Sequence, residues 1–201
     1  MSENADIGPR QEGFAAGDSP PPQTARELLE WAHDRYYGRV YGYCVRRLFA
    51  KDVAEDMVSA VFLRLVQRVD QFIGCDEARI RNWLFGAASN AVSAHVRTTK
   101  VRQKVLDAVR RQRANDLDRQ RSEPERLDWP VLYEAIFRLK PRHQDIVTLR
   151  FLEGFDHEEI AEILGMRPVT VRVTMMRALR KLRKLLQGSF GERSCDRRNV
   201  P

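Results

Sequence analysis

One stretch of the chain, residues 166–186, carries many basic side chains and no acidic one. Its basic residues are Arg167, Arg172, Arg177, Arg180, Lys181, Arg183 and Lys184. Their charges sum to +7, which equals the formal net charge of the whole chain, so the remaining residues sum to zero. A merely solvated helix face normally mixes charges of both signs, whereas a surface that binds phosphates is positive throughout. The composition of this stretch therefore predicts contact with nucleic acid.

Outside this stretch, no set of side chains has the spacing of a catalytic or metal-binding site. The histidines and cysteines are scattered, without the paired spacing that a metal ion needs. Asp52, Glu55 and Asp56 lie together, but a helix cap and a solvated face explain these carboxylates without a metal. The sequence also has no nucleophile–base pattern and no glycine-rich phosphate loop. We therefore expect no enzymatic activity, no metal and no cofactor.

The cysteines and the apolar runs indicate the compartment. Three cysteines, an odd number without paired spacing, give no disulfide framework and favour a reducing environment. No apolar run approaches the roughly 18 residues of a membrane span, and the polar N-terminus lacks the apolar core of a signal peptide. The sequence predicts a cytoplasmic protein that does not insert into a membrane.

The basic stretch forms the second half of a helix-turn-helix pattern over residues 156–186. Asp156 predicts the cap of the first helix, Gly165 can take the left-handed conformation of the turn, and Pro168 suits the start of the second helix. The residues expected to close the core between the two helices are Ile160, Ala161, Leu164, Val171 and Met175. A plain helical hairpin shares this periodicity, but the acid-free second helix favours one that enters the major groove of DNA.

Four residues of the second helix share one outward stripe at steps of three and four. These are Val169, Arg172, Val173 and Met176. An arginine can bind guanine through two hydrogen bonds, and apolar side chains can contact thymine methyl groups, so we expect this stripe to contact base edges. The flanking residues expected to hold phosphates are Arg167, Thr170, Arg177 and Arg180. From Arg180 to Lys184, a solvated helix end rich in cations is an equally good interpretation.

The N-terminal half is predicted to form an all-helical bundle over residues 24–97. Thr24 and Glu27 predict a capping box at the start, Gly38 a break in the first helix, and Asp52 the cap of a second helix. Behind Asp52, apolar residues at steps of three and four predict a buried stripe. A third helix is expected from about Ala78 to Val96, and no segment alternates as a strand does.

The whole chain is thus predicted to be all-α, with two helical domains joined by a charged linker. The second domain has four helices, and the last of them is expected to end near Leu186. The boundaries that we predict are a disordered tail over 1–23, a first domain over 24–97, a linker over 98–127, a helix-turn-helix domain over 128–188 and a flexible tail over 189–201.

Three stretches resemble bacterial sigma factors, the subunits that bring RNA polymerase to promoters. Residues 139–172 resemble the domain that binds the −35 element, and residues 52–65 resemble the helix that grips the polymerase clamp. Residues 83–97 resemble the helix that melts and reads the −10 element. The chain lacks the middle domain of larger sigma factors, so it is similar to the extracytoplasmic-function (ECF) group.

The resemblance implies contacts and partners. The residues that it assigns to core polymerase are Asp56, Ser59, Phe62 and Arg64, and those that it assigns to the −10 element are Cys75, Asp76, Asn90, His95 and Arg97. The partners that it implies are core RNA polymerase, promoter DNA and an inhibitory anti-sigma factor, met in the bacterial cytoplasm. The free protein is expected to be a monomer.

A second hypothesis is a self-sufficient helix-turn-helix regulator. Such a protein normally dimerises to read paired half-sites, and the sequence has no heptad seam that indicates a dimer. The sigma factor hypothesis also gives the N-terminal domain a purpose. The sequence departs from the family's usual pattern at Ser59, Ala60 and Gly86, the last of which replaces a polar or basic residue of the −10 helix.

Overall fold

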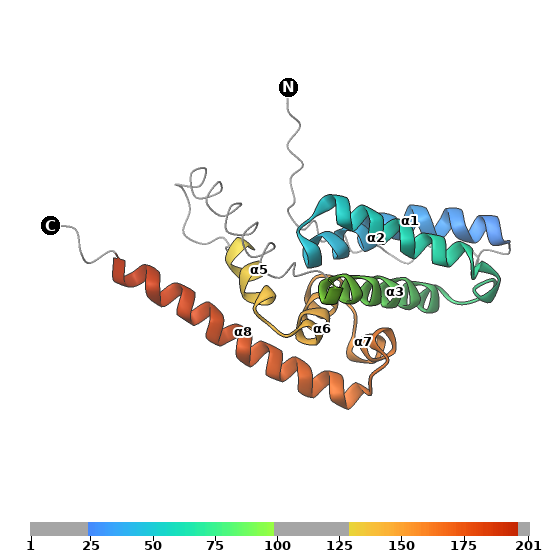
Figure 1. Ribbon diagram of the computed structural model, residues 1–201. Coiled ribbons are helices and arrows are strands. Elements are labelled where there is room, and N and C mark those ends of the chain that lie inside the picture. Colours follow the sequence, from blue (N-terminus) through green and yellow to red (C-terminus); the bar gives the residue numbers. More distant parts are fainter. Residues whose placement is uncertain (1–23, 99–128, 197–201) are drawn as a thin grey trace, which may run out of the picture.

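The described part of the chain is built from helices. The computed structural model describes residues 24–98 and 129–196, and these contain no strand. Figure 1 shows the helices in chain order: α1 (Ala25–Leu48), α2 (Lys51–Val66), the short 3-10 helix η1 (Val69–Gln71), α3 (Glu77–Thr98), α5 (Trp129–Phe137), α6 (Pro141–Phe151), α7 (His157–Leu164) and α8 (Pro168–Asp196). The predicted all-helical fold is confirmed. The predicted tail over 1–23 and linker over 98–127 lie outside the described residues, apart from Thr98, which ends α3.

Helix α1 is continuous, so the predicted break at Gly38 is wrong. It begins with the predicted capping box, in which the Thr24 hydroxyl accepts a hydrogen bond from the Glu27 amide. Tyr36 and Val40, on either side of Gly38, are both completely buried. A glycine in a helix interior costs about 1 kcal/mol, whereas burying one large apolar side chain contributes roughly 1.5–3 kcal/mol. Packing of both halves on one core therefore keeps the helix intact.

Helix α2 starts one residue before the predicted cap. Ala50 precedes the helix and makes no side-chain cap, so the predicted capping role of Asp52 is wrong. Asp52 lies within the first turn, where a carboxylate favours the helix dipole without a specific hydrogen bond. The predicted buried stripe of α2 is present at Ala54, Val58, Val61 and Leu65.

The first turn of α3 is tied to α1 by a carboxylate. Glu77 Oε1 accepts hydrogen bonds from Arg35 Nε at 2.8 Å and from the Tyr36 hydroxyl at 2.5 Å. Burial opposes a charge on Glu77, but the bonds from Tyr36 and Arg35 outweigh it and lower the pKa of the carboxyl group. The buried Tyr36 hydroxyl has its pKa raised to about 12, first by burial and then by Glu77.

The C-terminal helices follow the predicted turn chemistry. Asp156 and Glu159 form a reciprocal capping box at the start of α7, and Gly165 takes the left-handed conformation at its end (φ 60°, ψ 44°). Helix α8 continues to Asp196, so the predicted end near Leu186 is wrong, and residues 189–196 are helical instead of a tail. Once a helix exists, each added residue costs little, and the two glycines beyond Leu186 each cost only about 1 kcal/mol.

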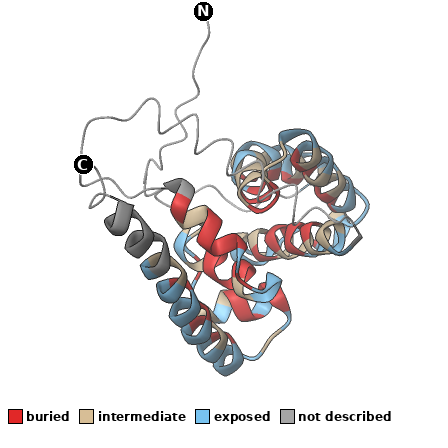
Figure 2. Ribbon diagram, turned by 60° about the vertical axis from the view of Figure 1, so that its left-hand side comes forward, coloured by how far each residue is buried: buried red, intermediate tan, exposed pale blue. Residues whose placement is uncertain are grey.

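The two halves of the chain share one core. The Phe85 ring of α3 meets the Phe155 ring, just before α7, with centroids 4.8 Å apart, and the Tyr43 ring of α1 lies 5.8 Å from the Phe85 ring. Helices α6 and α7 lie between α3 and α8 (Figure 1). Buried residues continue from the first bundle into α5–α7, whereas the outer side of α8 is exposed (Figure 2).

Candidate nucleic-acid interface

Helix α8 presents the predicted outward stripe to solvent. Its inner face is fixed by Val171, Met175 and Ala178, all buried in the core. On the opposite face, Val169 is 68% exposed and Met176 is 63% exposed. Together with Val173, they form one exposed apolar patch, and base edges in the major groove offer methyl groups for such a patch to contact.

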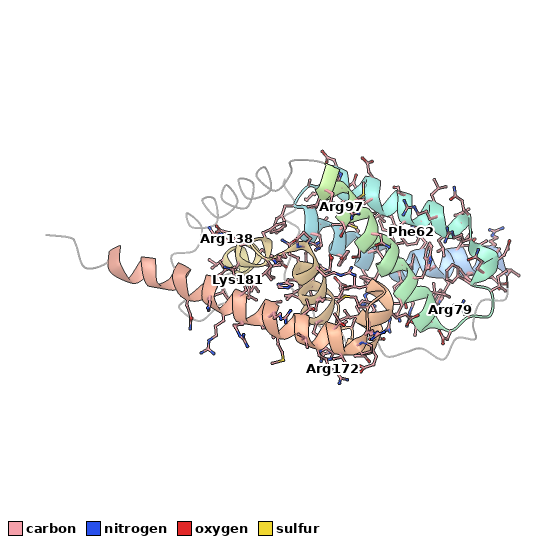
Figure 3. All side chains as sticks on the ribbon, turned by 60° about the horizontal axis from the view of Figure 1, so that its bottom comes forward. Phe62, Arg79, Arg97, Arg138, Arg172 and Lys181 are labelled. Atoms are coloured by element: carbon pink, nitrogen blue, oxygen red, sulfur yellow. The ribbon has the colours of Figure 1, made fainter. Side chains whose placement is uncertain are left out.

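Arg172 projects from the outward stripe near the start of α8. Figure 3 shows the side chain at the outer end of the helix-turn-helix, directed away from the body of the protein. Its Nη2 atom lies 2.7 Å from Oε1 of Glu158 on α7, and both side chains are more than half exposed. The sequence reasoning missed Glu158 as a partner, because fourteen positions separate the two residues along the chain. This carboxylate can hold the guanidinium in an extended position.

The residues predicted to hold phosphates surround the stripe. Arg167, Thr170, Arg177 and Arg180 are all exposed, as are the later basic residues of α8 up to Lys184. The positive charge of α8 also acts on α6. The pKa of His143 on α6 is lowered, first by burial and then by the charges of Lys140 and of Arg177 on α8. The exposed side of α8 can therefore bind a polyanion along several turns.

A second candidate surface is a hollow of about 580 Å³ between α2, η1, α3 and α7. Its lining includes the cations Arg64, Arg68 and Arg79, the aromatic rings of Phe72 and Trp83, and the carboxylate of Glu162. Trp83 is half-buried and packs on Phe72, with ring centroids 5.1 Å apart. Cations beside an aromatic face suit unpaired nucleotides, because the cations bind phosphates and the ring stacks on bases.

The residues predicted to contact the −10 element do not form a single surface in the structure. Asn90 lines the hollow, whereas Arg97 lies at the far end of α3 from Arg79 (Figure 3). His95 is half-buried near that far end. Cys75 and Asp76 have structural roles: the Cys75 thiol donates to the Gln71 carbonyl at 3.4 Å, and Asp76 accepts from the Arg79 amide at 2.7 Å.

The predicted polymerase contacts fall on two sides of α2. Asp56 and Ser59 are exposed, and Phe62 packs against His33 and Tyr37 of α1, with ring centroids 5.6 Å and 5.7 Å apart. Arg64 instead lines the hollow together with Arg68 and Arg79. An α-helix turns 100° per residue, so Arg64 and Arg68, four apart, share a face that Phe62 does not.

Sequence reasoning missed two apolar residues beside Phe62. Leu63 is 59% exposed and Val66 is 51% exposed, and Val66 lines a shallow groove with Leu29 and Phe62. Both residues are apolar but lie outside the buried stripe of α2. An apolar residue outside such a stripe is the sequence signal that could have identified them. They give this side of α2 an apolar surface suited to a protein partner.

Two conserved-domain families match the chain, one in each half. The family described as "Sigma-70 region 2" matches residues 32–102, and "Sigma-70, region 4" matches residues 131–182. An RNA polymerase sigma-E factor of Streptomyces avermitilis is 30% identical over 143 residues, which cover 71% of this chain and 76% of that protein. The chain belongs to the ECF sigma factors of bacterial RNA polymerase.

One further relative agrees with this family, and one solved structure agrees with the fold. The ECF RNA polymerase sigma factor BldN of Streptomyces coelicolor is 34% identical over 158 residues, and the match spans 77% of this chain and 58% of BldN. The solved structure of the sigma factor RpoE, in complex with the anti-sigma factor NepR from Bartonella quintana, has a TM-score of 0.58 and 20% sequence identity. That match covers 79% of this sigma factor and 96% of RpoE, and it supports the helical fold.

Membership of this family gives the chain a role in transcription initiation. Sigma factors are transcription initiation factors that direct RNA polymerase to promoters, and this sigma factor has both of the matched domains. Within the described residues, no helix is long and apolar enough to cross a membrane. The same residues contain no group of three or more histidine, cysteine, aspartate or glutamate side chains placed to hold a metal ion.

Proposed function

We propose that this sigma factor binds core RNA polymerase through α2 and reads a promoter with two separate surfaces. Helix α8 enters the major groove of the −35 element, where Val169, Arg172, Val173 and Met176 contact base edges. Arg167, Thr170, Arg177 and Arg180 hold the flanking phosphates. The observation that carries this proposal is the exposed, acid-free side of α8 opposite a fully buried inner face.

The −10 element binds along α3 and in the hollow beside it. Arg64, Arg68 and Arg79 attract the backbone of the melted strand, and Trp83 offers a ring for stacking. Asn90 lines the same hollow, and His95 and Arg97 extend the surface toward the end of α3. Cys75 and Asp76 act by shaping the loop before α3.

The polymerase contact lies on the side of α2 that faces away from the hollow. Asp56 and Ser59 supply polar contacts, and Phe62, Leu63 and Val66 supply apolar ones. Each domain binds weakly by itself, and polymerase raises the effective concentration of both domains at one promoter. An anti-sigma factor that covers this side of α2, or the outward stripe of α8, would silence the protein, by analogy with the NepR complex of RpoE.

Reconstituted transcription tests the proposal against a self-sufficient regulator. The purified protein is incubated with core RNA polymerase and a library of genomic fragments, and transcript start sites are mapped. We expect a stable complex with core polymerase and start sites that share motifs near −10 and −35 only when the sigma factor is present. Selective binding to promoter fragments without polymerase, together with no complex with core polymerase, would favour the regulator.

A further inference from the structure

Arg172 differs from the other basic residues of α8 because it has a carboxylate partner. Its Nη2 atom donates a hydrogen bond to Oε1 of Glu158 at 2.7 Å. Within the described part of the chain, the other basic side chains of residues 166–186 form neither an ion pair nor a hydrogen bond, namely those of Arg167, Arg177, Arg180, Lys181, Arg183 and Lys184. The pairing therefore distinguishes the arginine of the outward stripe from the arginines that flank it.

Both partners lie on backbone that other contacts hold in place. Glu158 stands between Asp156 and Glu159, the two residues of the capping box that fixes the start of α7. Arg172 follows Val171, which is completely buried in the core. Because α7 and α8 also pack on each other, the crossing of the two helices determines the position of the pair.

The ion pair contributes little to the stability of the fold. Both side chains are more than half exposed, and water and salt screen the attraction between exposed charges. A carboxylate beside a surface that binds DNA also repels phosphates, so charge attraction alone would disfavour it. An effect on the direction of Arg172 explains why a carboxylate at this place is useful.

The bond to Glu158 leaves Arg172 able to bind a base. A guanidinium group carries several N–H donors in a fixed plane, and this bond uses a single hydrogen of Nη2. The remaining donors still include neighbouring ones that can bind N7 and O6 of guanine together. A carboxylate, an arginine and a guanine can therefore form one continuous chain of hydrogen bonds.

An unpaired arginine at the same place would have a competing choice. Phosphates are charged acceptors close to every base, and contacts with them carry no sequence information. A guanidinium whose charge is partly neutralised by a carboxylate gains less from a phosphate. Ordering a long side chain on binding also reduces affinity by roughly two- to tenfold, and the bond to Glu158 orders Arg172 before DNA binds.

We propose that Glu158 is a positioning residue for base recognition, which directs Arg172 toward a guanine of the −35 element and away from the neighbouring phosphates. This inference rests on the proposed function, because it takes Arg172 to contact a base edge. Glu158 thereby determines specificity from α7, the first helix of the helix-turn-helix, without a contact of its own with DNA.

Binding to altered promoters tests this role. The full-length protein, as wild type, Glu158→Ala or Glu158→Gln, is assembled with core RNA polymerase. Affinity is measured for promoter fragments in which each base pair of the −35 element is changed in turn, at several salt concentrations. The Arg172→Ala variant identifies the base pair that depends on Arg172, and discrimination is the ratio of affinities at that base pair.

Loss of Glu158 should convert Arg172 from a base contact into a phosphate contact. We expect Glu158→Ala to lower discrimination at that base pair about fivefold, within the range that ordering of one side chain allows. The dependence of log affinity on log salt concentration should steepen by about one unit, because one more phosphate is neutralised. Glu158→Gln keeps an acceptor oxygen but not the charge, so it should lower discrimination by about twofold.

Two double variants separate this effect from others. In the Arg172→Ala background, Glu158→Ala should change neither discrimination nor the salt slope. In the Arg177→Ala background it should have the same effect as in the wild type, because Arg177 has no carboxylate partner within the described residues. Equal effects of Glu158→Ala in all backgrounds would overturn the proposal.

The remaining outcomes distinguish the alternatives. A uniform gain in affinity for every fragment would leave only charge repulsion by Glu158, and a uniform loss with a lower Tm would leave only a structural role in α7; either result overturns the proposal. If Arg172→Ala changes the ranking of fragments but the Glu158 variants do not, the proposed function stands and this inference alone is wrong. If Arg172→Ala leaves the ranking unchanged, the base contact of the proposed function is itself wrong, and the role of Glu158 is rejected with it.

Discussion

Arg172 shows what sequence reasoning captured at the level of single residues and what it missed. The helical period placed Arg172 on an outward stripe, and the structure has it exposed beside Val169 and Met176. The partner, Glu158, was not predicted, because a side-chain pair across a turn depends on how two helices cross. Likewise, the resemblance grouped Arg64 with Phe62, but the position of α3 places Arg64 in the hollow.

The Arg172→Ala variant should lose a base contact at the −35 element. We expect a loss of roughly 1–3 kcal/mol in affinity and a relaxed preference at one base pair, because a bidentate arginine discriminates between bases. The measurement is holoenzyme binding to a set of −35 variants at several salt concentrations. The matched control, Arg177→Ala, should weaken binding to all variants alike and lower the salt slope by about one unit. A change of slope without a change in the ranking of variants would contradict the assignment of Arg172.

Asp56 and Arg64 should separate polymerase binding from DNA binding. Asp56→Ala should weaken the complex with core polymerase, whereas Arg64→Ala should leave that complex intact and weaken binding to the −10 strand. Both residues are exposed and off the buried stripe, so each substitution should change the free energy of unfolding by less than about 0.5 kcal/mol. Polymerase affinity and single-stranded DNA affinity, measured for both variants, check the assignment. Weaker polymerase binding with Arg64→Ala would place Arg64 back in the polymerase contact.

At the level of helices, sequence reasoning succeeded where local chemistry determines the structure. The capping boxes at Thr24 and Asp156 and the left-handed Gly165 are present as predicted. It failed at Gly38 and at the end of α8, where glycine was read as a helix break. A glycine lowers the local helix propensity by an amount that packing or continued propagation can exceed.

The start of α3 should make the stability of the first bundle depend on pH. The pKa of Glu77 is lower in the folded protein than its ordinary value of 4.5, so ionised Glu77 stabilises the fold above about pH 4.5. That contribution is lost as the pH falls through the lowered pKa. We expect Glu77→Gln to be less stable than wild type at pH 7 and the difference to shrink below about pH 4.5. Thermal unfolding monitored by circular dichroism across this pH range measures the effect, and a difference independent of pH would contradict it.

At the level of the whole molecule, sequence reasoning predicted two domains and made no prediction about whether they contact each other. Each capping box and apolar stripe involves residues that are close together in the sequence. By contrast, the buried ion pair of Arg47 with Asp145, at 2.7 Å, joins residues that are 98 positions apart. A basic residue near the C-terminal end of a helix normally lies on the surface, where its charge interacts favourably with the helix dipole. Only the docking of α6 onto α1 makes Arg47 a buried residue.

Breaking the Arg47–Asp145 pair should uncouple the two domains. We expect Arg47→Met to cost about 3–5 kcal/mol, because it leaves the Asp145 carboxylate buried without its cationic partner. Calorimetry should then show two unfolding transitions where the wild-type protein shows one. Adding Asp145→Leu should recover part of the loss, since an apolar pair removes the uncompensated charge. An unchanged single transition in Arg47→Met would mean that this pair does not hold the domains together.

The close approach at Gly86 has a consequence for relatives of this protein. A Cβ atom at Gly86 of α3 would lie 3.1 Å from the backbone carbonyl oxygen of Ile163 on α7, and this carbonyl cannot rotate away as a flexible side chain can. Relatives with a bulky residue there should therefore hold the helix-turn-helix farther from α3 than this chain does. The identity of this one residue thus sets how closely the two halves of a sigma factor of this kind can pack against each other.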